Sequence, residues 1–213
     1  MADEVSVAPS PVSVATTAIA DPAPLGLAAF ALTTVLLSAK NAGWMTHATG
    51  SAWLGYAFFY GGLGQFAAGM WEFRRGNTFG ATAFSTYGGF WLGLGLWVEL
   101  VANPAVAGIA KAPTTAGAVV ASLNHDLGWI TLVFFIVTLY LMILSTQINL
   151  VIFLVFLALD ITFLVLAIGN FDAGSALLST GTVKIGGYLG LVTALLAFYG
   201  RSEERRVGKE CRP

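Results

Sequence analysis

The stretch YGGLGQFAAGMWEFRRGNTFGATAFSTY, residues 60–87, decides how this chain folds. An apolar run, a short polar turn and a second apolar run follow one another, and both apolar runs are rich in glycine. The turn carries Glu72, Arg74, Arg75 and Asn77. This pattern predicts two membrane helices that pack closely and reverse direction at a water interface.

The composition extends this prediction to the whole chain. Hydrophobic residues make up 57% of the 213 residues and charged residues 10%, whereas soluble domains are about 25% charged. Several apolar runs approach the roughly 20 residues that a helix needs to cross a bilayer. We therefore expect an all-α membrane protein in which residues 21–200 form one bundle of six transmembrane helices. A net charge of −1 gives no indication of a nucleic acid partner.

The expected spans follow from the apolar runs and the residues that interrupt them. They cover about residues 21–38, 52–71, 79–101, 127–144, 148–168 and 185–200. Asp21 can cap the first helix, Asn103-Pro104 is expected to end the third, and Gly169-Asn170 the fifth. An even number of spans places both termini on one side of the membrane. The basic residues are nearly balanced between the two sides, and the paired arginines of the tight turn favour cytoplasmic termini.

Two terminal segments fall outside the expected bundle. Residues 1–20 lack a basic segment followed by an apolar core, so we expect a disordered leader and not a signal peptide. Residues 201–213, RSEERRVGKECRP, break abruptly with the preceding composition and resemble a translated sequencing adapter. We expect this tail not to be authentic, and a genuine charged tail is the alternative. Cys211, the only cysteine, lies in it, so no disulfide or thiol chemistry is expected.

No catalytic constellation is present in the sequence. There is no Gly-x-Ser-x-Gly, no His-Glu-x-x-His and no phosphate-binding Gly-Lys-Thr. The two histidines, His47 and His125, are far apart and fall in expected loops, so we expect no metal site and no cofactor. We therefore expect that the protein is not an enzyme. Polar and aromatic residues within apolar helices favour a path for a solute instead.

Three polar side chains could serve such a path. Asp160 lies near the middle of the fifth span, where a charge costs roughly 2.5–3.5 kcal/mol on insertion scales. It is either a protonatable group lining a path or a neutral acid hydrogen-bonded between helices. Glu72 either pairs with Arg74 or Arg75, caps the turn, or couples to protons. Gln65 either binds a carboxylate or bridges two helices.

Glycine pairs at four-residue spacing recur in two of the expected spans. They are Gly89 and Gly93 in the third span and Gly186 and Gly190 in the sixth. This spacing lets helix backbones approach closely in lipid. We expect these pairs to pack within the bundle, and a direct role of the glycines in a pore is the alternative. Close packing at these pairs could also serve contacts between subunits.

Four separate motifs follow one another along the chain. They are DPAPLGLAAF at 21–30, YGGLGQ at 60–65, EFRRGNTFGATAFSTYGGFW at 72–91 and LAIGN at 166–170. Together they resemble the acetate transporter family, the succinate-acetate permeases, and the likeness extends from Asp21 to Tyr199. The resemblance implies a six-helix protomer that assembles as a homo-hexamer, with a separate path through each subunit. It implies passage of acetate and related small carboxylates, either coupled to protons or through a channel.

The resemblance also implies which residues form the narrowest part of the path. Carried over by motif, Phe30, Tyr87 and Leu159 would form a hydrophobic constriction. A dry constriction penalises a hydrated anion, and the Tyr87 hydroxyl group can donate one hydrogen bond during passage.

Substrate capture is implied at the start of the first helix. The residues that the resemblance marks for substrate binding are Asp21, Pro22, Leu25, Gly26 and Gln65. Asp21 stands where the family usually has asparagine, and an ionised Asp21 would repel a carboxylate that a helix N-terminus attracts. Either Asp21 is largely protonated, or anion capture is weaker here. Asp160 is a second departure, and we hypothesise that it adds a protonatable site beside the constriction.

These observations predict a transporter or channel in the inner or plasma membrane. Its expected substrates are acetate and related short carboxylates, with succinate possible, and protons are the expected coupling ion. Two alternatives stay open. One is a pore for a small neutral solute such as ammonia or undissociated acid. The other is a membrane scaffold or acetate sensor that transports nothing.

Overall fold

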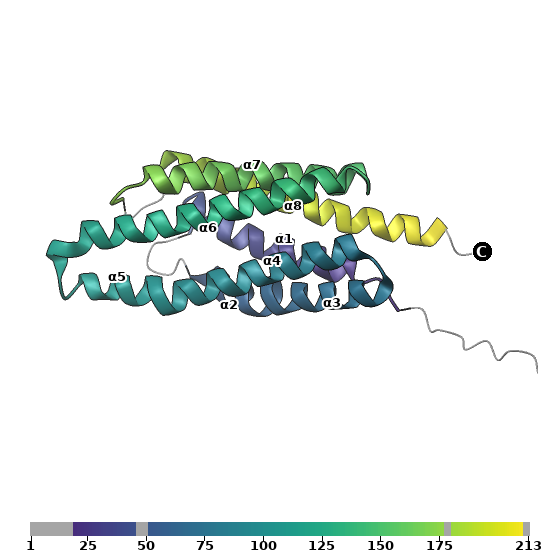
Figure 1. The fold of residues 1–213 in the computed structure, drawn as a ribbon, viewed down its shortest axis with the longest axis horizontal. Helices are drawn as coiled ribbons and strands as arrows, with labels where there is room; N and C mark the ends of the chain where they lie inside the picture. Colours follow the sequence, from purple (N-terminus) through teal and green to yellow (C-terminus); the bar gives the residue numbers. More distant parts are fainter. Residues whose placement is uncertain (1–18, 46–50, 177–179, 211–213) are drawn as a thin grey trace, which may run out of the picture.

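The computed structural model describes residues 19–45, 51–176 and 180–210, with side chains as far as residue 200. Residues 1–18 of the expected leader, His47 and Cys211 lie outside the described residues. The described part of the chain forms six helical rods, as the apolar pattern predicts (Figure 1). The all-α membrane bundle is therefore confirmed.

Some rods consist of several helical segments. The rods are α1 (Ala23–Asn41); α2 (Ala52–Tyr56), η1 (Ala57–Gly64) and α3 (Gln65–Arg75); α4 (Thr78–Trp97), η2 (Val98–Ala102) and α5 (Asn103–Ile109); η3 (Pro113–Thr115) and α6 (Ala116–Ser145); α7 (Leu150–Asp172); and α8 (Gly181–Glu210). Five rods, those that contain α1, α4, α6, α7 and α8, are long and apolar enough to cross a membrane. The remaining rod ends in the charged turn at Glu72, Arg74 and Arg75, beyond Trp71.

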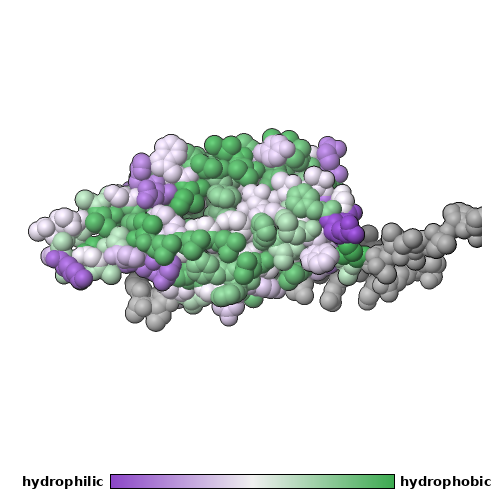
Figure 2. All heavy atoms as spheres, turned by 60° about the horizontal axis from the view of Figure 1, so that its bottom comes forward, coloured by the Kyte–Doolittle hydropathy of each residue, from purple (hydrophilic) through white to green (hydrophobic). Residues whose placement is uncertain are grey.

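The rods pack as a bundle around a shared apolar core. Helix α1 packs against α8, α7 packs against both α6 and α8, and α4 packs against α3 and η1. Figure 1 shows α6, α7 and α8 on one side, α2 to α5 on the other, and α1 between them. Hydrophobic residues also cover much of the outer face in Figure 2, and Phe59 is 74% exposed. Such a surface suits contact with lipid.

The chain reverses between α3 and α4 as the sequence predicts, but α3 continues to Arg75, beyond the expected end near Trp71. Gly76 ends α3 with a positive φ of 80°, a conformation that glycine adopts without a steric penalty. Asn77 then caps α4, because its Oδ1 accepts a hydrogen bond from the amide of Gly80 at 3.0 Å. At the same end of the bundle, Asp21 Oδ1 accepts a 3.2 Å hydrogen bond from the amide of Ala23, the first residue of α1.

The predicted end of the third span at Asn103-Pro104 is wrong, because the rod continues to Ile109. The segment before it, Val98–Ala102, is π-helical. Pro104 then lies in the first turn of α5, where a missing backbone donor is tolerated. A change of helix type therefore replaces the expected break.

His125 was expected in a loop but lies within α6, which begins at Ala116. Its ring contacts the rings of Phe171 and Trp129, with centroids 5.5 Å and 6.2 Å apart. The neighbouring Asn124 donates from Nδ2 to the carbonyl oxygens of residues 174 and 176 at 2.9 Å and 3.1 Å. These polar residues therefore tie α6 to the end of α7 instead of ending a helix.

The predicted end of the fifth helix at Gly169-Asn170 is also wrong. Asn170 stays helical and donates from Nδ2 to the carbonyl oxygen of Leu166 at 2.8 Å. Helix α7 runs to Asp172, and the positive φ of 51° comes at Gly174. The glycine that adopts a positive φ after the helix is therefore Gly174, and Gly169 lies within the helix.

The two glycine pairs behave differently. A Cβ atom on Gly186 would lie 2.6 Å from Leu166 Cδ2, and one on Gly190 would lie 2.2 Å from Ser38 Oγ, so this pair packs within the bundle as expected. The expectation is wrong for Gly89 and Gly93, which have no neighbouring atom within 4 Å of a Cβ position. These two lie on a face of α4 that is open in the protomer.

Candidate functional site

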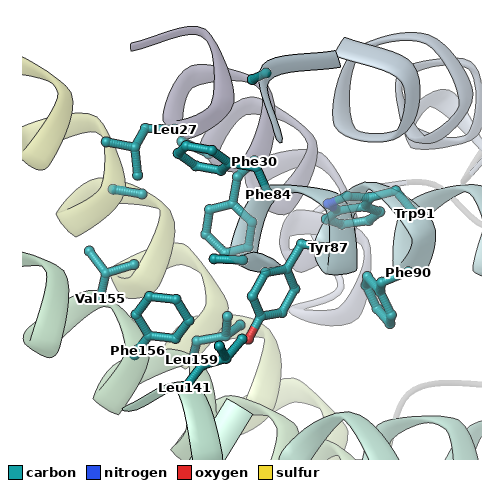
Figure 3. Packing of buried hydrophobic residues seen from close by; sticks show 14 of the residues in the cluster. Leu27, Phe30, Phe84, Tyr87, Phe90, Trp91, Leu141, Val155, Phe156 and Leu159 are labelled. Atoms are coloured by element: carbon teal, nitrogen blue, oxygen red, sulfur yellow. The ribbon is translucent and has the colours of Figure 1, made fainter. Parts of the chain in front are cut away.

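Three apolar side chains from three different rods meet in the middle of the bundle. They are Phe30 of α1, Tyr87 of α4 and Leu159 of α7, with 6%, 3% and 5% of their surface exposed. The rings of Phe30 and Tyr87 meet edge to face with centroids 5.8 Å apart. Figure 3 shows all three in one buried cluster. We call this group the neck.

A cavity lies on each side of the neck. One, of about 90 Å³, reaches towards the start of α1 and is called the narrow cavity. The other, of about 500 Å³, reaches towards the end of α1 and is called the wide cavity. Phe30, Tyr87 and Leu159 are the only residues of the described part of the chain that line both. A solute that moves from one cavity to the other therefore has to pass these side chains.

The narrow cavity is apolar except at a few acceptor groups. Gln65 is 1% exposed, and its Oε1 has no hydrogen-bond partner among the described residues. Glu72 is 0% exposed, and neither of its carboxyl oxygens has such a partner. Both side chains line the cavity together with Asn77. A ligand that brings a hydrogen-bond donor would satisfy these oxygens.

Glu72 lies beyond Trp71, at the interfacial end of its rod. Burial raises the pKa of this carboxyl group, while the nearby Asn77 side chain and the Arg75 charge act in the opposite direction. Arg75 Nη1 lies 3.9 Å from Glu72 Oε2. A group of this kind can hold a proton at a pH at which an exposed glutamate is ionised.

Most of the residues that were expected to capture substrate lie outside the two cavities. Asp21 forms an ion pair with Arg75 at the outer end of the narrow cavity. Asp21, Pro22, Leu25 and Gly26 line neither cavity. Leu25 is 44% exposed on the outside, and a Cβ atom on Gly26 would lie 2.7 Å from the Phe84 ring. Of the five residues expected to bind substrate, Gln65 lines a cavity and the other four do not.

Asp160 is buried next to the neck but does not face either cavity. Its side chain is 6% exposed, and Oδ1 has no hydrogen-bond partner in the described part of the chain. It follows Leu159 directly, yet it is absent from the lining of both cavities. An unpaired charge at this depth is costly, which favours a neutral carboxylic acid.

The wide cavity carries donor groups that sequence reasoning missed. Trp53 Nε1, Trp91 Nε1 and Thr34 Oγ1 are buried without a hydrogen-bond partner among the described residues, and all three side chains line this cavity. Lys40 lines it as well, with Nζ 5.5 Å from the centre of the Trp53 ring. Trp53 stands at the start of an expected span, where tryptophan is typical of an interfacial anchor, and Trp91 stands inside an apolar run, so no local signal marked either as a cavity residue.

Comparison with known proteins agrees with this architecture. A family model described as GPR1/FUN34/yaaH matches residues 4–205. The chain belongs to this family. The solved structure of the bacterial acetate channel SatP matches with a TM-score of 0.71 and 33% identity, over 92% of this chain and 99% of that one. The resemblance drawn from the motifs is therefore confirmed.

Two relatives show how far the likeness to other members of the GPR1/FUN34/yaaH family extends. Acetate permease A of Emericella nidulans is 40% identical over 84% of this chain and 59% of its own length. The succinate-acetate/proton symporter SatP of Escherichia coli K12 is 36% identical over 86% of this chain and 87% of its own length. The chain spans about three fifths, 59–62%, of the length of the fungal relatives it matches.

Proposed function

We propose that this protein passes acetate and related short carboxylates, succinate among them, across the cell membrane. The path runs from the narrow cavity through the neck to the wide cavity. One observation carries the proposal: among the described residues, only Phe30, Tyr87 and Leu159 line both cavities. The names of two relatives, an acetate permease and a succinate-acetate/proton symporter, support the choice of solute.

The neck selects by size and by hydration. Its walls are apolar except for the Tyr87 hydroxyl group, so a passing carboxylate loses most of its water there. Short acids lose less than long polar ones, because they bring fewer polar atoms into the neck. The donor groups of the wide cavity, including Lys40 and the indole of Trp91, offer new hydrogen bonds to a carboxylate after passage.

Assembly and orientation belong to the same proposal. We place the protein in the inner or plasma membrane as a homo-hexamer with cytoplasmic termini. The open strip on α4 at Gly89 and Gly93 supports a contact between subunits, because a neighbouring helix can approach closely there. The paired arginines of the turn support the orientation. Cross-linking of purified protein in lipid nanodiscs should give a ladder that ends at six subunits, and a ladder that ends earlier would contradict this assembly.

Flux in proteoliposomes tests the transport proposal. We expect uptake of labelled acetate, and weaker uptake of succinate, by the complete chain. Leu159→Trp should block the neck and abolish uptake. Leu195→Trp, at a position of α8 that is 65% exposed, serves as the matched control and should leave uptake intact.

The same assay separates the alternatives. If only ammonia or undissociated acid crosses, without current, the protein is a pore for neutral solutes. If no solute crosses and Tyr87→Ala changes a signalling response in cells, the protein is a scaffold or sensor. Either result would replace the proposed function.

Proton coupling requires a carboxyl group that gains and loses a proton during the cycle. Asp160 stays a proposal for this role, since it is buried beside Leu159 with an unpartnered oxygen. Acetate uptake by Asp160→Asn that keeps the wild-type pH dependence would remove Asp160 from consideration. Glu72 differs from Asp160 because it lines the path itself.

A further inference from the structure

Two carboxyl groups and one guanidinium group meet at the outer end of the narrow cavity, and of these Glu72 lines the cavity itself. Arg75 Nη1 pairs with Asp21 Oδ1 and lies 3.9 Å from Glu72 Oε2, so one nitrogen serves both acids. Asp21 and Arg75 are 42% and 36% exposed, whereas Glu72 is completely buried. The arrangement has an outer acid in contact with water and an inner acid in contact with the path.

The inner acid has few groups that could neutralise it. Charges on Arg75, in its own helix, and on Asp21, in the segment before α1, act on Glu72. The N-cap of α4, the uncharged Asn77, lies at the same point and favours the ionised form of Glu72. A Cβ atom on Gly80 would lie 2.6 Å from Asn77 Nδ2 and 3.2 Å from Glu72 Cδ. Because Arg75 already pairs with Asp21, an ionised Glu72 would share a counter-charge that is in use.

We propose that Glu72 binds the proton that accompanies each carboxylate, and that Arg75, shared between Glu72 and Asp21, transmits this protonation to the mouth of the path. The inference rests on the proposed transport function and names the group that couples it to protons. The proton comes from bulk water at the mouth and first occupies one carboxyl oxygen of Glu72. It then leaves with the carboxylate through the neck and returns to water from the wide cavity, so that Glu72 is left ionised until the next proton binds.

The protonation state of Glu72 determines whether a carboxylate can bind in the narrow cavity. An ionised Glu72 repels a carboxylate anion in the same small cavity, whereas a protonated Glu72 is neutral and offers an O–H donor to it. Loss of the proton draws Arg75 from Asp21 towards Glu72. Since Asp21 also accepts the bond from the amide of Ala23, this movement loosens the contact between the end of α3 and the start of α1.

The first experiment measures acetate uptake by the complete chain in proteoliposomes, with and without an inward proton gradient at clamped membrane potential. Glu72→Gln mimics the protonated acid, and its uptake should lose the response to the gradient. Glu99→Gln is the matched control, because Glu99 is exposed and lines neither cavity. A wild-type response in Glu72→Gln overturns the proposal.

A second pair of variants tests the shared guanidinium. Asp21→Asn frees Arg75 for Glu72 and removes a negative charge, and both changes favour ionised Glu72. The pH of half-maximal uptake should therefore move to lower pH. Glu72→Asp keeps a carboxyl group and should retain the gradient response, which shows that a loss in Glu72→Gln is not caused by misfolding. An unchanged pH profile in Asp21→Asn overturns the role of Arg75.

A readout without transport separates this inference from the proposed function. Infrared difference spectra of the protein in lipid, recorded between acidic and basic pH, should contain a protonated carboxyl band that Glu72→Gln removes and Glu99→Gln keeps. If the band behaves in this way and acetate does not cross, the proton site stands and the proposed solute is wrong. If acetate crosses and the band is unaffected by Glu72→Gln, the proton site is wrong.

Discussion

The hydroxyl groups of Tyr87 and Thr138 lie 2.8 Å apart and form a buried hydrogen bond. Thr138 Oγ1 lies 2.6 Å from the carbonyl oxygen of Phe134 and donates its proton there. A hydroxyl group has only one proton to give, so Thr138 is left to accept from the phenol. Tyr87 can therefore donate to a passing carboxylate only after it leaves Thr138.

This pair predicts the effect of Thr138→Val. The variant keeps the shape of the side chain but leaves the buried phenol without an acceptor, which costs about 1–3 kcal/mol of stability. A carboxylate in the neck then becomes the available acceptor, so the KM for acetate should fall while the unfolding temperature in detergent falls too. Thr138→Ser keeps the acceptor and should behave like the wild type. A higher KM in Thr138→Val would show that Thr138 helps the solute directly.

The neck itself predicts a change in selectivity. Leu159→Ala removes a side chain that is 5% exposed between the two cavities. Such truncations cost about 2–5 kcal/mol in well-packed cores, and here they also widen the path. The ratio of succinate flux to acetate flux should rise in proteoliposomes. Leu195→Ala, on the outer face of α8, should leave this ratio as it is, and an unchanged ratio in both variants would place the selective step elsewhere.

The sequence pattern predicts the fold and part of the site, and the physical reasons can be stated. The apolar runs locate every rod, because the bilayer imposes its thickness on the helices that cross it. They do not show where helices end outside the bilayer, so the start of α6 and the extension to Ile109 were missed. The reversal of the chain after Arg74 and Arg75 was predicted correctly, because polar residues there separate two apolar runs. The cap by Asn77 and the positive φ at Gly76 were not predicted.

The remaining parts of the site depend on contacts between distant segments. The ion pair of Asp21 with Arg75 joins residues 54 positions apart, and it balances the charge that Asp21 was expected to present to a substrate. Thr138 stands within an apolar helix with no motif around it. Its importance comes from the packing of α6 against Tyr87, which periodicity does not reveal.

Close contact between α1 and α8 predicts a loss of stability in Gly187→Ala. A Cβ atom there would lie 2.4 Å from the backbone nitrogen of Ala42 and 2.8 Å from the carbonyl oxygen of Ser38, and neither backbone atom can rotate away. Overpacking of this kind costs about 1–3 kcal/mol. Gly108→Ala in α5 is the control, since its Cβ would meet no atom within 4 Å. Thermal unfolding of both variants in detergent checks the difference, and equal unfolding temperatures would contradict the tight packing.

The two cavities carry ionisable side chains of opposite kind, and this difference leads to a final prediction about Lys40. Among the described residues, Lys40 is the one basic side chain that lines the wide cavity, while Glu72 is the one acidic side chain that lines the narrow cavity. Lys40 should therefore attract carboxylates at the wide side, and a doubly charged acid more than a singly charged one. Lys40→Met should weaken succinate binding by about twofold to fivefold, the range for a partly solvated ion pair.

The expected loss for Lys40→Met should shrink as the ionic strength rises, because salt screens exposed charges. Competition of succinate against labelled acetate, with succinate added on each side of the membrane in turn, provides the measurement. Lys184→Met is the matched control, because Lys184 is exposed and lines neither cavity. An equal loss in both variants would mean that net charge matters and the position of Lys40 does not.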